Sequence, residues 1–306
     1  LYHEAAERFT HAVTALPEFP EVSVEVCDKL MDEAVSPLID AWRESPMGES
    51  RRGEAVARRI RRTAKRTARN IVSQYADSSF RPAQMEFVFG QNGLSPIVLE
   101  LGDGIFVYLQ GRIDRVDVMT GGGLRVIDYK SGSRKFDPTL VYWGLQLQLL
   151  LYLAAALARV PGSHAAGFFY CRIADPTVQT ESRIREEVER QIAKKLALSG
   201  ISLSDVTILR AQGGQQAAMV TKDGKPNGRF AASMVDEAGM EKLLTFARNK
   251  AAALADEIYA GEIDDSPVER ETFNACQNCE YSAICVFDPL RKPRRRLTAK
   301  RLEDLT

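Results

Sequence analysis

Hydrophobic and polar positions alternate with a period of two along two neighbouring stretches in the middle of the chain. Residues 111–119 read G-R-I-D-R-V-D-V-M and residues 124–130 read L-R-V-I-D-Y-K, with β-branched residues in both. The glycine-rich stretch between them, from Thr120 to Gly123, is typical of a β-hairpin turn. The pattern therefore predicts two antiparallel strands.

Further helical and strand patterns flank this hairpin on both sides. Apolar residues at helical spacing predict helices over residues 1–15, 22–42 (one or two helices), 51–74, 139–159, 181–198 and 236–259. Short β-rich runs predict strands over residues 84–90, 97–101, 105–109, 166–173 and 206–211. The order of a helix, a three-strand meander, a helix and a strand indicates an α/β protein.

Two carboxylates and one lysine lie on the predicted hairpin. Antiparallel pairing brings Asp114 and Asp128 towards one end of the sheet, and the strand period puts Lys130 on the same face as Asp128. Such a cluster is costly to bury without a partner, and a divalent metal such as Mg²⁺ or Mn²⁺ is the simplest partner for two carboxylates. The lysine would then stabilise an attacking hydroxide or the negative charge that develops on a phosphate.

The series G-R-I-D-R-V-D, D-Y-K-S-G and Q-x-x-x-Y resembles the motifs of the PD-(D/E)XK nuclease superfamily, and in particular its RecB-like branch. Within that branch the chain resembles the nuclease domains of AddB subunits from bacterial AddAB helicase–nucleases, from His3 to Cys285. The resemblance implies a restriction-endonuclease-like α-β-β-β-α-β core. We expect a single nuclease domain over residues 1–306, with a helical insertion at about 22–75, a catalytic core at about 83–175 and a C-terminal extension at about 176–306.

The resemblance also implies roles for individual residues. The implied catalytic residues are Asp114, Asp128, Lys130, Gln148 and Tyr152, and the implied metal ligands are His3, Asp114, Asp128 and the carbonyl of Tyr129. Read from the residues alone, His3 is equally well a partly buried or surface histidine. Gln148 and Tyr152, four positions apart, are alternatively polar residues at the rim of a packed helix. Glu86, just ahead of the first motif strand, lies near the active site or is an ordinary acid at a strand end.

A basic stripe lies on the predicted helix over residues 51–74. Its members fall at spacings of four, three and four: Arg58, Arg62, Lys65 and Arg69. One interpretation of this stripe is a solvent-exposed helix face without a binding function. Because Glu54 is the only acid between Arg51 and Arg69, we favour a helix that binds the phosphates of DNA. The basic segment over residues 291–301 is a second candidate for DNA contact, or a solvated end.

Three of the five cysteines form a C-x-x-C-x5-C cluster: Cys276, Cys279 and Cys285. A zinc site is one explanation, although three cysteines are one short of a tetrahedral set and no histidine follows. In AddB-like nucleases a cluster of this spacing joins an upstream cysteine to hold a structural [4Fe–4S] cluster. The family position of that cysteine would precede Leu1, so we expect the iron–sulfur cluster in a longer parent protein and an incomplete one here. Cys27 does not match the family position.

The overall composition does not identify a binding partner, but the sequence does suggest where in the cell the protein works. The formal net charge is zero, and 45% of the residues are hydrophobic, as in a globular protein. The longest apolar run, Leu149 to Ala158, is too short to span a membrane. No signal peptide pattern opens the chain, and residues 1–4 read as the middle of a helix, so we expect a fragment of a longer protein. Five cysteines, three of them clustered, do not look like a secreted disulfide framework, so we expect a bacterial cytoplasmic protein.

The sequence therefore predicts a Mg²⁺-dependent exonuclease acting on DNA in double-strand break repair and recombination. It contains no Walker A motif, so the resemblance implies that an AddA-like helicase–nuclease subunit supplies ATP hydrolysis. A stand-alone or CRISPR-associated RecB-like exonuclease is one alternative. A catalytically silent DNA-binding scaffold module is another.

Overall fold

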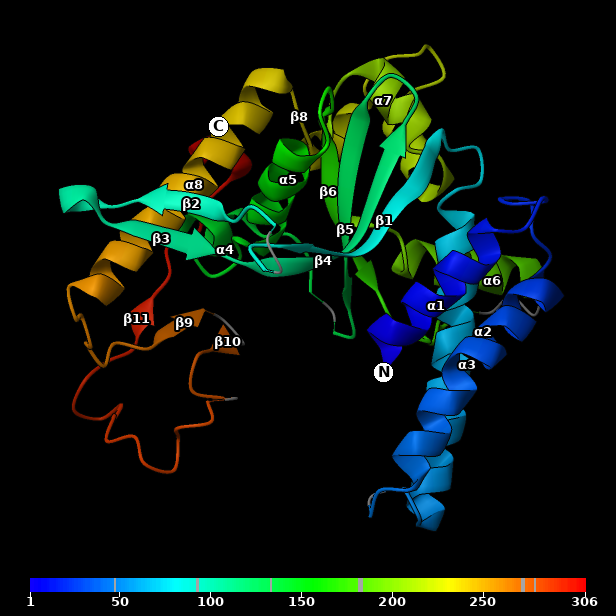
Figure 1. Ribbon diagram of the computed structural model, residues 1–306, viewed down its shortest axis with the longest axis horizontal. Helices are drawn as coiled ribbons and strands as arrows, with labels where there is room; N and C mark the ends of the chain where they lie inside the picture. The colour runs from blue at the N-terminus through cyan, green and yellow to red at the C-terminus, as the bar shows by residue number, and fades with distance from the viewer. Residues whose placement is uncertain (47, 92–93, 133, 181–183, 271–272, 278) are drawn as a thin grey trace.

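A central six-stranded sheet organises the computed structural model, which describes residues 1–46, 48–91, 94–132, 134–180, 184–270, 273–277 and 279–306 (Figure 1). The strands run in the spatial order β1 (Phe80–Phe89), β4 (Gly111–Met119), β5 (Gly123–Lys130), β6 (His164–Arg172), β7 (Ser199–Leu203) and β8 (Met234–Val235). The first three strands are antiparallel, and β6 lies parallel to β5. The predicted α/β class and the predicted hairpin are thus confirmed.

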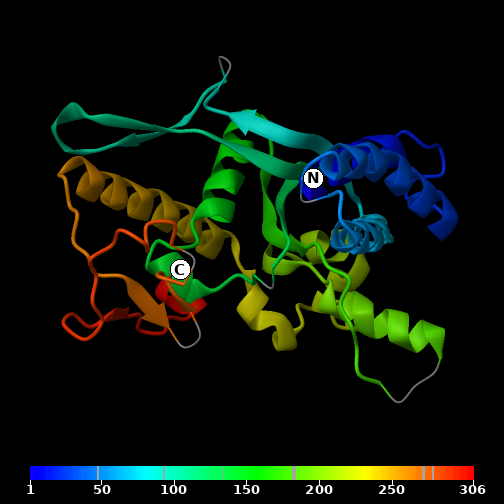
Figure 2. The same cartoon turned by 90° about the horizontal axis from the view of Figure 1, so that it is seen from below.

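Helices cover both faces of this sheet, because apolar side chains alternate between the two faces along each strand. Val116, Val126 and Phe168 face α5 (Gln148–Arg159) and α8 (Glu237–Tyr259). Ile127 and Phe169 face the layer of α1 (Tyr2–Thr14), α2 (Val24–Arg43) and α3 (Arg51–Ser73). Figure 2 shows the sheet between these two helical layers.

Two smaller sheets lie outside this core. The hairpin of β2 (Ile97–Glu100) and β3 (Phe106–Leu109) leaves the central sheet between β1 and β4 and lies along α8, where Arg248 donates to the carbonyl of Val98. The second sheet consists of β9 (Val268–Arg270), β10 (Phe273–Asn274) and β11 (Arg295–Arg296). It lies at the opposite end of the molecule from α2 and α3 in both views of the ribbon (Figures 1 and 2).

The remaining helices correct two of the predictions. Residues 206–211, predicted as a strand, form α7 (Val206–Ala211), because the Asp205 carboxylate accepts hydrogen bonds from two amides of the first turn. The single helix predicted over residues 139–159 is two helices, α4 (Pro138–Tyr142) and α5. Gly144, with φ of +80°, turns the chain between them.

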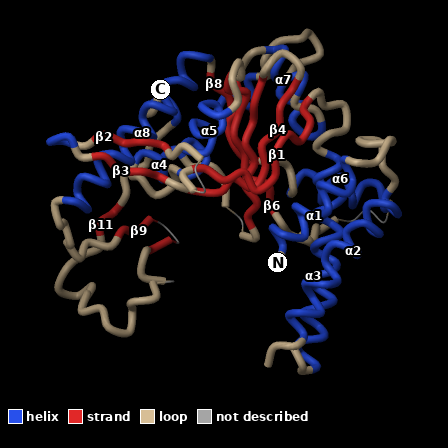
Figure 3. Tube along the Cα trace, viewed as in Figure 1, coloured by secondary structure: helices blue, strands red, loops and turns tan. Residues whose placement is uncertain are grey.

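Part of the predicted C-terminal extension belongs to the central sheet. Neither β7 nor β8 was predicted as a strand, yet the two extend the sheet beyond β6 (Figure 3). The helix α6 (Arg185–Lys195) connects β6 to β7. The six-stranded sheet therefore ends with strands from the segment after residue 176.

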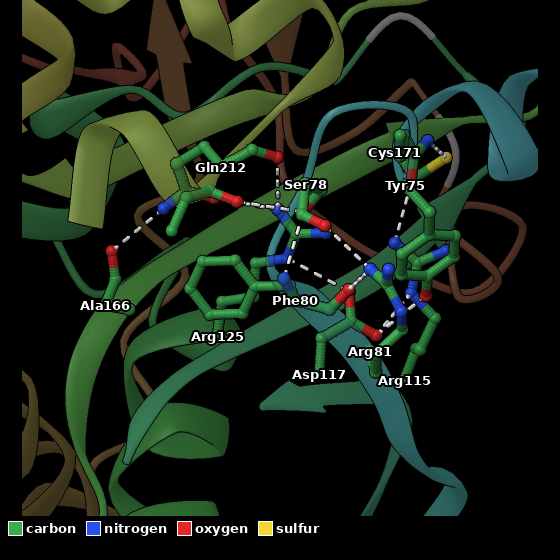
Figure 4. Close-up of polar contacts among 12 residues, drawn as sticks. Tyr75, Ser78, Phe80, Arg81, Arg115, Asp117, Arg125, Ala166, Cys171 and Gln212 are labelled. Carbon is green, nitrogen blue, oxygen red and sulfur yellow. Dashed lines mark hydrogen bonds and ion pairs between the residues drawn. The ribbon is translucent and has the colours of Figure 1, made fainter. Parts of the chain in front are cut away.

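A charged network is buried on the α3 side of the sheet (Figure 4). Asp117 accepts a hydrogen bond of 2.9 Å from the Tyr75 hydroxyl, and its two oxygens lie 3.1 Å from Nε of Arg115 and 3.0 Å from Nε of Arg125. Arg125 also donates to Oε1 of Gln212 at 2.8 Å. All three charged side chains are fully buried, so their mutual pairing offsets part of a large desolvation cost.

Candidate active site

Asp114 and Asp128 lie opposite each other on one face of the sheet. The β4–β5 pairing runs from Val118 opposite Leu124 to Arg115 opposite Ile127, and the two aspartates occupy the next position on each strand. Their faces are set by Val116 and Val126, two residues away on each strand, which both point into the α5 side of the core. Both carboxylates are buried.

The hydrogen-bonded ladder between β4 and β5 ends at these aspartates. Where a backbone carbonyl of β4 would accept the next bond, the carboxylate of Asp114 does so instead: its Oδ2 accepts from the backbone N–H of Tyr129 at 2.6 Å. The strands therefore separate at the point where the two carboxylates meet.

Lys130 connects Asp128 to α5. Its ammonium lies 2.6 Å from Oδ2 of Asp128 and donates a 3.1 Å hydrogen bond to Oε1 of Gln148. The Gln148 amide in turn donates to the Tyr152 hydroxyl at 2.9 Å. The structure thus brings together four of the residues that the sequence grouped, in a continuous chain of polar contacts.

His3 and Glu86 complete the rim of the site. Nδ1 of His3 lies 3.3 Å from Oδ1 of Asp114, and this hydrogen bond raises the pKa of the histidine. In the register of β1 and β4, Met85 lies opposite Arg115 and Phe87 opposite Ile113. Glu86, between them on β1, therefore lies opposite Asp114. Burial raises the pKa of Glu86, which pairs with Arg112 at 2.6 Å and has an unusual φ of +47°.

Two residues of β6 that sequence reasoning missed also reach the site. In the register of β5 and β6, Tyr170 lies beside Asp128 and Arg172 beside Lys130, so both lie on the same face of the sheet as these two residues. Burial and the charge of Asp128 raise the pKa of Tyr170 to about 12, and its hydroxyl has no hydrogen-bond partner among the described residues. The parallel register of β5 and β6 was the missing information, because it depends on packing rather than on local pattern.

The donor atoms at this site suit a hard divalent cation. Burial, and then the neighbouring charge of Asp114, raise the pKa of Asp128, while Lys130 opposes this shift. Two buried carboxylates that repel each other would gain from a cation between them. Among the described residues, no three His, Cys, Asp or Glu side chains converge into a ready-made metal site. Asp114 and Asp128 are therefore the candidate ligands, with His3 and the Tyr129 carbonyl beside them.

The basic stripe of α3 has more acidic partners than its own sequence neighbourhood suggested. Lys65 lies 2.5 Å from Asp32, and Arg69 donates two hydrogen bonds to Asp28. Arg62 lies 2.5 Å from Asp175. Three of its four members are thus paired, and Arg58 is the one without an ion pair among the described residues. The acids come from elsewhere in the chain.

The cysteine cluster is partly exposed and incomplete. Cys276, Cys279 and Cys285 have free thiols in the loop between β10 and β11. Cys27 is buried in the core of the N-terminal helices, and in both ribbon views α2 lies at the far end of the molecule from this loop (Figures 1 and 2). Cys171 is buried on the same side of the sheet. The described cysteines do not supply four ligands for an iron–sulfur cluster.

The nearby basic segment is partly neutralised. Lys292 lies 2.5 Å from Asp264, and Arg294 and Arg296 lie 3.8 and 3.2 Å from Glu269. These contacts hold part of the segment against β9 rather than leaving it a free, solvated end. Within the described part of the chain, no helix is both long and apolar enough to cross a bilayer.

Comparisons with known proteins indicate the family to which this chain belongs. A family model described as the PD-(D/E)XK nuclease superfamily matches residues 1–286. The chain is 32% identical over 306 residues to the B subunit of the ATP-dependent helicase/deoxyribonuclease of Alkaliphilus metalliredigens, covering 94% of this chain and 26% of that protein. The protein of the same name from Clostridium tetani is 33% identical, with the same coverage, and that from Caldanaerobacter subterraneus is 35% identical over 284 residues, 88% of this chain and 24% of the relative. The chain thus spans about a quarter of the length of these curated relatives.

Proposed function

Because the chain belongs to the PD-(D/E)XK nuclease superfamily, we propose that it is a metal-dependent deoxyribonuclease domain of a helicase–nuclease. The name of its relatives, which are B subunits of an ATP-dependent helicase/deoxyribonuclease, supports this assignment. We infer an exonuclease that serves double-strand break repair and recombination. The sequence has no Walker A motif, so a partner of the AddA type would supply ATP hydrolysis.

Asp114 and Asp128 would hold Mg²⁺ or Mn²⁺, with His3 and the Tyr129 carbonyl as further candidate ligands. When bound, such a cation polarises a phosphoryl oxygen and makes water more acidic. Asp114 is held in place by the backbone N–H of Tyr129, and Asp128 by the ammonium of Lys130. These contacts fix both carboxylates before any ligand arrives.

Lys130 would supply a fixed positive charge to the attacking oxygen or to the phosphoryl oxygens as their negative charge grows. Gln148 restricts where the ammonium lies, and Tyr152 orients the Gln148 amide. The two α5 residues are therefore positioning residues in this proposal, since their hydrogen bonds reach the catalytic group through Lys130.

The opposition of Asp114 and Asp128 on one sheet face, with Lys130 beside them, is the observation that carries this proposal. The test is cleavage of single- and double-stranded DNA with Mg²⁺, with Mn²⁺ and with EDTA. Asp114→Asn and Asp128→Asn should each abolish cleavage while DNA binding in EDTA persists. Asp223→Asn, in an exposed turn, is the matched control and should cleave normally. Normal cleavage by Asp128→Asn, or by the wild type in EDTA, would overturn the proposal.

A further inference from the structure

A large basic cleft opens beside the catalytic face. It has a volume of about 1460 Å³ and lies where β5 and β6 end and β7 begins. Its walls come from the segment after β5, from the end of α6, from the start of α8 and from the C-terminal residues near Arg301. The cleft is thus built from segments far apart in the sequence.

Arg172 joins the cleft to the active site. It lies at the end of β6 as the direct neighbour of Lys130, and it lines the cleft. Its side chain is half-buried, and its Nε is buried without a hydrogen-bond partner among the described residues. The side chain as a whole is only partly buried and forms no ion pair among the described residues, so its guanidinium is suited to donate to a phosphate oxygen.

The charge of the cleft is strongly one-sided. Six basic side chains line it: Lys135, Arg172, Lys194, Lys195, Lys242 and Arg301. Within the described residues none of the six forms an ion pair, in contrast to the α3 stripe, three of whose four members are paired with acids. The acidic residues of the lining are Asp236, whose carboxylate caps α8 by accepting from Gly239, and Glu303. Such an excess of unpaired cations attracts a polyanion.

The walls of the cleft also carry two aromatic rings, Phe136 and Phe230, each only partly buried. A positively charged groove with aromatic side chains is the arrangement that binds an unpaired strand, because the bases of a single strand can stack on the rings. The catalytic carboxylates are themselves recessed, with Asp128 only 2% exposed, so a single strand reaches them more easily than a duplex does.

We propose that this cleft binds the single-stranded DNA segment that adjoins the cleaved phosphodiester. Arg172 would hold the phosphate nearest the active site, and the lysines of α6 and α8 would hold phosphates farther along the strand. The proposal rests on the nuclease function proposed above and adds the form of the substrate and the path that it takes.

The test compares two double variants that remove equal charge. Lys194→Ala/Lys242→Ala takes two lysines from the cleft, and Lys222→Ala/Lys225→Ala takes two exposed lysines from a turn outside it. Binding of a fluorescent single-stranded oligonucleotide is measured in EDTA over a range of salt concentrations, so that no cleavage occurs. We expect the cleft variant to bind about tenfold more weakly and its salt slope to fall by about 1.4, or ~0.7 for each lost contact. The control should match the wild type.

The outcomes separate the two proposals. An unchanged affinity and salt slope in the cleft variant would overturn the cleft assignment, as would wild-type protein that binds duplex more tightly than single strands. Wild-type protein that binds single strands through the cleft but cleaves no DNA with Mg²⁺ would overturn the nuclease function instead, and would leave the cleft as a strand-binding site.

Discussion

The backbone N–H of Tyr129 donates to the carboxylate of Asp114 at 2.6 Å, so a peptide group of β5 holds a side chain of β4. The Tyr129 side chain points to the opposite face, where its hydroxyl accepts a 3.2 Å hydrogen bond from Arg115. Tyr129 thus links the face that carries Asp114 to the buried network on the opposite face. The position of Asp114 depends on both faces of the sheet.

Lys130→Ala should reduce cleavage by ~10²-fold or more, because the site would lose one preorganised charge at the phosphoryl group. DNA binding in EDTA should change little, since many other basic groups contribute to affinity. The measurement is single-turnover cleavage beside Lys29→Ala, which removes an exposed lysine elsewhere. Near-normal cleavage with poor binding would show that Lys130 anchors a phosphate and is not catalytic.

Tyr152→Phe should reduce kcat by about fivefold, because loss of one neutral hydrogen bond of about 1 kcal/mol loosens Gln148 and through it Lys130. KM should stay the same, because the Tyr152 hydroxyl acts through Gln148 and not on DNA. Tyr259→Phe, which changes an exposed tyrosine, is the control. A raised KM with unchanged kcat would instead place the Tyr152 hydroxyl on the substrate.

Asp117→Ala should destabilise the fold by about 3–5 kcal/mol, because Arg115 and Arg125 would then face each other, fully buried and without a carboxylate. The urea midpoint of unfolding measures the change. Glu33→Ala breaks an exposed pair with Lys29 and should cost less than about 1 kcal/mol. Equal losses in the two variants would mean that the buried network contributes no more than a surface pair.

Among single substitutions in the basic stripe of α3, Arg58→Ala should weaken DNA binding the most. Arg62, Lys65 and Arg69 already have acidic partners, and a phosphate would have to displace them. We expect the salt slope of DNA binding to fall by ~0.9 or less for Arg58→Ala on duplex DNA. An equal fall for each of the four single variants would show that the acids give way to DNA.

The thiol cluster yields a conditional prediction. A longer protein that contains this chain and a suitable fourth cysteine should be brown, and Cys276→Ala or Cys279→Ala should remove the iron–sulfur absorbance. This chain alone should bind iron poorly, because Cys27 and Cys171 are buried away from the loop. Stoichiometric zinc without iron in the longer protein would show that the cluster is a zinc site.

The sequence predicted the β4–β5 hairpin and the opposition of its aspartates well, because both follow from a local period and a local turn. It failed at residues 139–159, where a helical pattern continues through the break at Gly144. There the side chain of Gln146 bonds to the Asp137 N–H and the Lys135 carbonyl, and these contacts hold the connection between α4 and α5.

The other failures arose where the partners are distant in sequence. The acids that neutralise α3 come from residues 28, 32 and 175, which no local window around the stripe contains. The neighbours of Asp128 and Lys130 on β6 depend on the parallel register of two strands that α4 and α5 separate in the sequence. The basic cleft was missed for the same reason, because at least four separate segments form its walls.

The buried charges on the α3 side of the sheet also restrict which amino-acid substitutions the fold can tolerate. Arg115, Asp117 and Arg125 each depend on another member, so losing any one leaves the rest worse placed than before. Replacing all three with apolar residues would also require apolar partners at Gln74, Tyr75 and Gln212, because the polar groups of these buried side chains would otherwise lose their hydrogen bonds. Replacing the three residues one at a time, however, produces single and double variants that are less stable than either the starting protein or the fully exchanged one. The three positions should therefore be exchanged together or retained together, and a library that varies them one at a time would miss the tolerated combinations.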